Sequence, residues 1–167
     1  MAESRWFPVV AFVVAAGAVF VVTVASVHLL SSDTVPVQGY PQHRFFEGWT
    51  RWDTGWYFSI ATQGYRYFGP GVQASVAFFP AYPLAMRFAD VVVPGDALAA
   101  GVVVTYALGL LSVVLFWRWC RAAIRSDAVP LAVAVLVLWP CAFFLYGAVY
   151  SDALFLAAAL GSLLLLE

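Results

Sequence analysis

Residues 45–65 read FFEGWTRWDTGWYFSIATQGY and hold three of the seven tryptophans of the chain. If this stretch is a helix that ends near Gly64, its large apolar side chains recur at steps of three or four residues, the spacing of one helix face; they are Phe45, Trp49, Trp52, Trp56 and Ile60. Asp53 lies on a neighbouring stripe. A helix with tryptophans on one side and a carboxylate beside them suits the interface between a membrane and water. The stretch therefore predicts an interfacial helix over about residues 45–63.

The composition points to a membrane protein. Of the 167 residues, 64% are hydrophobic and 10% are charged, whereas about 25% of the residues of a soluble domain are charged. The net charge is -1, and the eight basic residues, all of them arginine, form no basic patch. Nucleic-acid binding needs such a patch, so no nucleic-acid partner is expected.

Three long apolar segments are predicted to cross the membrane, at residues 7–30, 97–117 and 129–146. A spanning helix needs about 20 apolar residues; a cleaved signal peptide is the alternative for the first segment. A fourth apolar segment, residues 153–167, is too short to cross and is expected to be a partial span. We expect one all-α polytopic membrane domain over residues 1–167 that is the N-terminal part of a larger module.

Polar residues and prolines mark the ends of these segments. Gly95 or Asp96 is expected to start the second span, and Ser126 or Asp127 to cap the third. Pro140 is expected to kink the third span near its far end.

Arginines set the orientation of these spans. Arg118, Arg121 and Arg125 follow the second span, and the positive-inside rule assigns their loop to the cytoplasm. The N-terminus is then cytoplasmic, and loop 31–95 is extracytoplasmic and carries the interfacial helix and a second short helix over residues 82–89. Asp53 and Asp152 share the outer compartment. The absence of lysine beside abundant alanine, valine and arginine favours a bacterial plasma membrane.

Three motifs occur in order along the chain: WDTGWYFSIATQGY at 52–65, AFFPAYPLAMR at 77–87, and WPCAFFLYGAVYSDALF at 139–155. Together they resemble the PIG-V type mannosyltransferases and their bacterial relatives, which belong to the GT-C superfamily of polytopic glycosyltransferases. The first two motifs are specific, and the third is weaker by itself. The resemblance covers the N-terminal part of that family.

The resemblance implies transfer of a sugar, typically mannose, from a polyprenyl-phosphate donor to a hydroxyl of a lipid or glycan acceptor outside the cytoplasm. It implies a single displacement that inverts the anomeric carbon. An acidic residue in the first outer loop is the expected catalytic base in such families, and Asp53 is the matching position.

The residues themselves agree with a base at this position. An alcohol is a poor nucleophile until a base takes its proton, and a carboxylate at a partly dry interface suits that task. Two structural roles for Asp53 stay open at this point, an ion pair with Arg51 or Arg66 and the capping of a turn.

Other polar side chains are candidates for substrate binding. Arg51, Arg66 and Arg87 could contact the phosphate of the donor, with Arg66 preferred; the alternative is that each points to lipid headgroups. Tyr57 and Tyr65 could stack on a sugar, although an aromatic belt explains them equally well.

Ser151 and Asp152 either cap the last helix or contact substrate. A divalent metal between Asp53 and Asp152 is a further option, but two carboxylates without a nearby histidine are a sparse ligand set, and no metal ligand is assigned.

Two other functions remain open. The first is a non-catalytic or remnant membrane subunit that works only with a partner chain supplying the missing helices. The second is a small transporter or channel, which would require charges inside the spans, and none lies there away from the ends.

Overall fold

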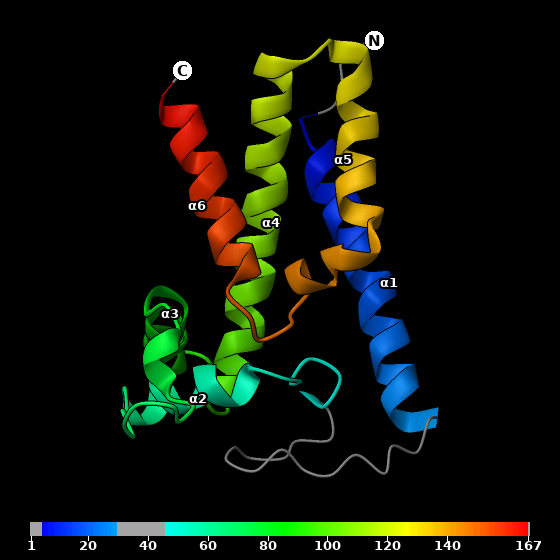
Figure 1. Cartoon of the computed structure of the whole chain (residues 1–167). Helices are drawn as coiled ribbons and strands as arrows, with labels where there is room; N and C mark the ends of the chain where they lie inside the picture. The colour runs from blue at the N-terminus through cyan, green and yellow to red at the C-terminus, as the bar shows by residue number, and fades with distance from the viewer. Residues whose placement is uncertain (1–4, 30–45, 167) are drawn as a thin grey trace.

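The computed structural model describes residues 5–29 and 46–166, and every regular element within these ranges is a helix (Figure 1). The predictions that fall on residues 30–45, among them Phe45 as a helix start, and on Glu167 lie outside the described residues. The elements are α1 (Phe7–Leu29), α2 (Thr54–Gln63), η2 (Ser75–Ala77), α3 (Ala81–Asp90), α4 (Ala97–Ala123), η3 (Ser126–Ala128), α5 (Val129–Leu138), η4 (Pro140–Leu145) and α6 (Asp152–Leu165).

Two of these helices are long and apolar enough to cross a membrane: α1, with 23 residues, and α4, with 27. The valines at positions 10, 13, 14, 21 and 22 of α1 are each more than half exposed. Such an apolar exposed surface is unusual on a soluble monomer, so α1 is suited to contact lipid or further helices. The position of α1 agrees with the first predicted span, and α4 begins where the second was predicted. Helix α4 continues beyond the predicted end at residue 117, so Arg118 and Arg121 lie on this helix and not in a loop.

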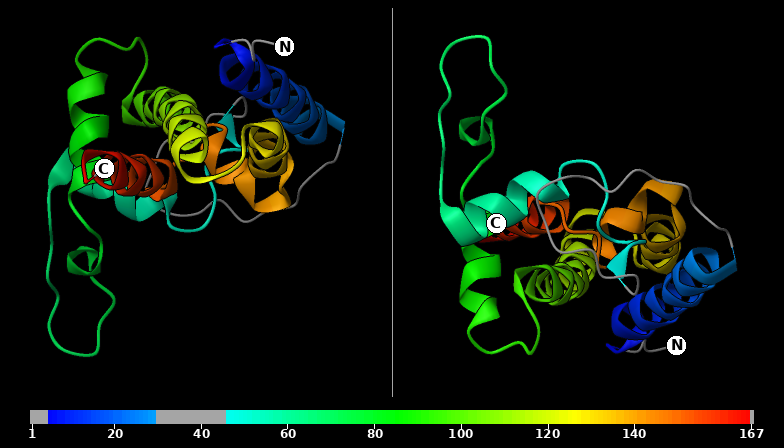
Figure 2. Two further views of the ribbon diagram at one scale, coloured as in Figure 1. Left: turned by 90° about the horizontal axis from the view of Figure 1, so that it is seen from above. Right: turned by 90° about the horizontal axis from the view of Figure 1, so that it is seen from below.

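Helix α4 is the centre of the bundle. It packs against α6, α5 and α1 along its length and against α3 near its start, and Figure 2 shows these helices arranged around it. Helices α2 and α3 lie together at the end of the bundle opposite to the α4–α5 connection (Figure 1). The predicted short helix over residues 82–89 is present as α3.

The third predicted span is divided. Helix α5 ends at Leu138, Trp139 is extended with φ -65° and ψ 134°, and Pro140 opens the 3₁₀ helix η4. A residue before proline is sterically biased toward extended backbone, so Pro140 ends the α-helix and does not merely kink it. The predicted cap from Ser126 or Asp127 is also wrong, because Ala128 occupies the cap position without a side-chain bond and the carboxylate of Asp127 pairs with Arg125 at 3.1 Å.

Non-helical backbone lies well inside the bundle between η4 and α6. Thr105 Oγ1 of α4 donates to the carbonyl of Ala148 at 2.9 Å, and Ser112 Oγ donates to that of Ala153 at 3.1 Å. At 1.5 Å per residue these donors lie roughly 12 and 22 Å from the start of α4. Irregular backbone at such depth needs internal hydrogen-bond partners. The buried hydroxyl of Thr105 supplies one to Ala148, whereas that of Ser112 bonds the first turn of α6. The connection 146–151 is therefore recessed from the end of the bundle where α4 begins.

Residues 46–53 form turns, so the tryptophan-rich helix begins at Thr54 and not near residue 45. Trp52 has φ 45°, in the left-handed region that bulky residues avoid. The predicted single apolar face is consequently wrong: Trp49 is 1% exposed, whereas Trp52 is 69% exposed. Sequence periodicity could not show this, because the bonds that hold residues 49–53 come from residues 146–150.

The predicted start of α4 at Asp96 is confirmed. Its Oδ1 accepts hydrogen bonds from the backbone N–H groups of Leu98 at 3.0 Å and Ala99 at 3.1 Å. We expect Asp96→Ala to destabilise the fold by about 1 kcal/mol, the usual cost of losing such a cap, and to lower the midpoint of thermal unfolding in detergent. Asp90→Ala is the matched control, because Asp90 is an exposed acid at the C-terminal end of α3. Equal losses in the two variants would contradict the capping role.

Candidate functional site

Two segments almost 100 residues apart in sequence are joined at the site. The indole Nε1 of Trp49 donates to the carbonyl of Tyr146 at 2.8 Å, and the N–H of Val149 donates to the carbonyl of Trp49 at 3.1 Å. Gly147 lies against the Trp49 ring with φ 93°, where a Cβ would come within 3.0 Å of the indole. A buried tryptophan three residues before the first sequence motif therefore joins that part of the chain to the third motif.

The hydroxyl of Tyr150 holds the turn at Trp52. It donates to the carbonyl of Arg51 at 3.2 Å and accepts from the backbone N–H of Asp53 at 2.7 Å. The Trp52 and Tyr150 rings are also in edge contact, with centroids 6.4 Å apart. One phenol thus fixes the backbone on both sides of the strained residue and sets the direction in which Asp53 leaves the turn.

Tyr57 and Ser151 form the second bridge between the same segments. Tyr57, one turn into α2, is buried, and its hydroxyl lies 2.9 Å from Ser151 Oγ with which it shares a hydrogen bond. Ser151 occupies the cap position of α6, but its side chain makes no capping bond there. Of the two roles considered for Ser151, the structure therefore does not show the capping of α6 by its side chain.

The second motif forms the wall behind Tyr57. The Tyr57 ring meets Phe78 and Tyr82 edge-on, with centroids 5.3 and 5.2 Å away. Tyr82 is 1% exposed, and its hydroxyl donates to the carbonyl of Gly101 at 3.0 Å and lies 2.7 Å from Thr105 Oγ1. All three motifs therefore contribute to one cluster of hydroxyl-bearing side chains.

Asp53 lies at the rim of this cluster. It occupies the cap position of α2, yet its carboxylate makes no capping bond, and within residues 5–29 and 46–166 it forms no ion pair. The two structural roles considered for this carboxylate, a cap and a pair with Arg51 or Arg66, are thus absent there. Asp53 is exposed, so the partly dry setting expected from the sequence is not provided by these residues.

Asp152 begins α6 and is also exposed. It lies at the edge of an apolar cavity of about 460 Å³ between α4, α5, η4 and α6, lined among others by Phe116, Leu136 and Leu156. The charges of Asp53 and Asp152 act on the same two phenols, Tyr57 and Tyr150. The two carboxylates thus belong to one electrostatic neighbourhood.

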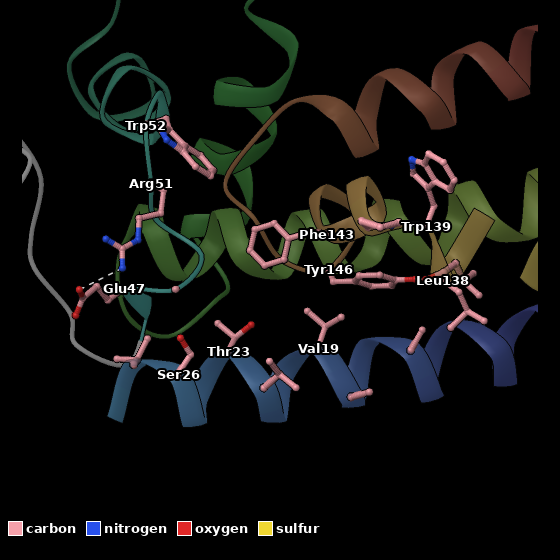
Figure 3. A pocket seen from close by; sticks show the side chains of 17 residues that line it. Val19, Thr23, Ser26, Glu47, Arg51, Trp52, Leu138, Trp139, Phe143 and Tyr146 are labelled. Carbon is pink, nitrogen blue, oxygen red and sulfur yellow. Dashed lines mark hydrogen bonds and ion pairs between the residues drawn. The ribbon is translucent and has the colours of Figure 1, made fainter. Parts of the chain in front are cut away.

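The predicted phosphate-binding arginines are dispersed. Arg51 is adjacent to the strained turn, and its Nη2 donates to Glu47 Oε1 at 3.3 Å (Figure 3). Arg66 lies beyond α2, where its backbone N–H and carbonyl bond Ser75 Oγ and its side chain is exposed. Arg87 is an exposed side chain of α3. Arg51 is separated from Asp53 by one residue in the chain, whereas the preferred Arg66 lies beyond the end of α2.

Tyr65 is not part of the cluster. Its hydroxyl donates to the carbonyl of Phe78 at 2.7 Å and braces the loop between α2 and α3. Conversely, sequence reasoning gave no role to Tyr150, whose phenol holds the turn, or to the buried hydroxyl of Thr54, which donates to the carbonyl of Arg51 at 2.8 Å. Tyr150 adjoins Ser151 in the third motif, and this position was the signal that could have identified it.

The phenols at the site are held in their neutral form. Burial raises the pKa of Tyr150 to about 12, and the negative charges of Asp53 and Asp152 add to this effect against the bond to the Asp53 backbone. Burial also raises the pKa of Tyr57, with the hydrogen bond to Ser151 opposing it and the two carboxylates adding to it. At neutral pH both phenols are therefore hydrogen-bonding groups and not bases.

This protonation state predicts a stability change in alkali. An ordinary phenol ionises near pH 10, so the stability contributed by the neutral phenols is fully present below about pH 10 and is lost as the pH rises toward 12. We expect a pH titration of tyrosinate absorbance to contain a component near pH 12 that Tyr150→Phe reduces by one tyrosine. A component near pH 10 removed by that substitution would contradict the hydrogen-bonded setting of Tyr150.

Within the described parts of the chain, no group of three or more histidine, cysteine, aspartate or glutamate side chains is arranged to hold a metal ion. Comparison with known proteins adds no assignment: no family model matches the sequence, and no curated protein or solved structure is significantly similar to the chain.

Proposed function

We propose that this protein is a membrane-embedded glycosyltransferase module of the GT-C type. It would move a sugar, of the mannose class, from a polyprenyl-phosphate carrier to a hydroxyl of a lipid or glycan acceptor on the extracytoplasmic side. The observation that supports this proposal most is the convergence of the three sequence motifs on one cluster, with the Asp53 carboxylate at its rim.

The proposal includes a polytopic topology in a bacterial plasma membrane. In this topology the membrane contains α1, α4, α6 and the segment formed by α5 with η4. Helices α2 and α3 lie at the outer surface of the membrane. Support comes from the apolar exposed face of α1 and from the position of the arginine-bearing α4–α5 connection at the opposite end of the bundle (Figure 1). The positive-inside rule assigns that connection, and the N-terminus, to the cytoplasm.

In the proposed reaction the Asp53 carboxylate accepts the proton of the acceptor hydroxyl as the new glycosidic bond forms. The bond between the anomeric carbon and the carrier phosphate breaks, and the phosphate leaves with the electron pair. Tyr57, Tyr150 and Ser151 are neutral donors and acceptors for sugar hydroxyls beside that carboxylate. The Asp53 carboxylate lies at the rim of the cluster and makes no structural bond within the described residues.

The direct test uses membranes that contain the protein, native acceptor lipids and a polyprenyl-phosphate mannose with a radiolabelled sugar. We expect label to leave the carrier and to appear in an acceptor fraction. Label that stays on the carrier over the lifetime of the protein in these membranes would contradict the proposal.

A second function is favoured by one observation, the exposure of both Asp53 and Asp152. General-base catalysis and charge stabilisation are strongest where water is excluded, and the described residues leave the two carboxylates open. A partner-dependent subunit would gain its missing walls from another chain. Transfer that appears only when extracts of the native membrane are added would favour this second function.

A further inference from the structure

A long groove runs between α1 and the paired elements α5 and η4 (Figure 3). Its volume is about 1130 Å³, above the range of about 300–1,000 Å³ that holds a drug-sized molecule. Side chains on both walls are mainly apolar, among them Val19, Val22 and Val27 on α1 and Val137, Phe143 and Tyr146 opposite. A groove of this kind fits a hydrocarbon chain and not a free sugar.

One end of the groove is polar. Glu47, Arg51 and Trp52 line it there, and Thr23 and Ser26 of α1 face the same end (Figure 3). Tryptophan and arginine are the residues that membrane proteins place at the level of lipid headgroups. The lining of the groove therefore matches an amphiphilic molecule: most of its length is apolar, and one end is charged.

Arg51 is suited to bind a phosphate at that end. Its side chain is 34% exposed, and its hydrogen bond within the described residues is the one from Nη2 to Glu47 at 3.3 Å. A guanidinium has five N–H donors in a planar fork that matches phosphate oxygens. Among residues 5–29 and 46–166, most donors of Arg51 therefore remain for a ligand, while Glu47 orients the guanidinium.

The polar end of the groove adjoins the candidate base. Arg51 and Asp53 are separated by one residue, so their Cα atoms are at most ~7.6 Å apart. The left-handed turn at Trp52, held by Tyr150, lies between them. A phosphate on Arg51 would accordingly bring its attached sugar next to the cluster of Asp53, Tyr57 and Ser151.

We infer that the groove between α1 and α5–η4 holds the first isoprene units of a polyprenyl phosphate, with the phosphate bound by Arg51. This inference rests on the proposed function for the identity of the lipid. Arg51 was one of three candidate phosphate contacts in the sequence, and the structure adds the apolar groove beside it. The carrier enters along α1 from the membrane, and the strained turn at Trp52 separates its phosphate from the carboxylate that activates the acceptor.

Equilibrium binding of tritiated polyprenyl monophosphate to the purified protein in detergent tests the site without any transfer reaction. We expect Arg51→Gln to weaken binding by about tenfold to a hundredfold, as the loss of charge-assisted hydrogen bonds implies. The double variant Glu47→Gln with Arg51→Gln should show the same loss, which controls for the negative charge of Glu47 after its bond to Arg51 is removed. A polyprenol of the same length without phosphate should bind wild type as weakly as the phosphate binds these variants. Unchanged affinity in the double variant would overturn the role of Arg51.

The apolar part of the site has its own matched pair of variants. Ala18 is an exposed residue of α1 that lines the groove, whereas Val14 is exposed on the same helix and does not line it. We expect Ala18→Trp to fill the groove and to weaken binding at least tenfold, and Val14→Trp to leave it unchanged. Equal affinities in the two variants, or displacement of the probe by phosphatidylglycerol at equal concentration, would overturn the inference.

These outcomes are separable from a failure of the proposed function. Asp90→Asn should bind the lipid with wild-type affinity, because Asp90 is exposed at the end of α3 and does not line the groove. Lipid binding that is weakened by the groove variants, in a protein that transfers no sugar, would therefore support the lipid site and count against the transferase. Sugar transfer by a protein whose groove variants bind the lipid as tightly as wild type would support the transferase and count against the lipid site.

Discussion

Asp53→Asn should lower the rate of sugar transfer by about a hundredfold to ten-thousandfold, the usual contribution of a general base. The asparagine amide has nearly the same shape but cannot accept the proton of the acceptor hydroxyl. The backbone N–H of residue 53 still donates to Tyr150, and the Asp53 carboxylate makes no bond within the described residues. The variant should therefore fold and insert as wild type does, and the loss should appear in kcat in a transfer assay.

Asp90→Asn is the matched control for this experiment. Asp90 is also an exposed acid outside the two long helices, but it ends α3 and has no part in the cluster. We expect its transfer rate to equal that of wild type. Wild-type transfer by Asp53→Asn, or an equal loss in both variants, would remove Asp53 from the proposed mechanism.

Trp49→Ala should destabilise the fold by about 3–5 kcal/mol, the cost of truncating a large buried aromatic side chain. Trp49 is 1% exposed, and its indole N–H donates to the buried carbonyl of Tyr146. Truncation would leave a cavity and an unsatisfied carbonyl where the segment just before the first motif packs on the third motif. Chemical unfolding in detergent measures this loss, and the transfer rate should fall with the folded fraction.

Trp52→Ala is the control that distinguishes this structure from the periodic helix. On one helix face Trp49 and Trp52 would be equivalent, yet the Trp52 side chain is mostly exposed. Surface substitutions of this kind usually change stability by less than about 0.5 kcal/mol. Similar losses in the two variants would contradict the turn over residues 46–53.

The two long helices could be predicted because an apolar run of about 20 residues is typical of a spanning helix. Apolar length located α1 and α4, and a carboxylate before an apolar run located the start of α4 at Asp96. Prolines were less informative, since Pro140 had the expected position but ended α5 where a kink was expected. After this break η4 packs close to Gly109 of α4, where the missing Cβ leaves room for the carbonyl of Leu145.

The candidate site was predicted by residue type and not by geometry. Asp53, Tyr57, Ser151 and Asp152 were named from the sequence, and the structure brings them into one neighbourhood. Arg66, Arg87 and Tyr65 were named on the same grounds and lie elsewhere. Hydrogen bonds between segments almost 100 residues apart determine which of these side chains lie in the cluster. The local sequence pattern contains no information about such long-range bonds.

The most direct test of the proposed function is the anomeric configuration of the transferred sugar. A single displacement assisted by one carboxylate base inverts the anomeric carbon, whereas a covalent intermediate on a second carboxylate would retain it. With a polyprenyl-phosphate mannose of known configuration as donor, nuclear magnetic resonance of the product should show the opposite anomer. A product with the configuration of the donor would contradict the role of Asp53 as a base, and the absence of any product would contradict the transferase itself.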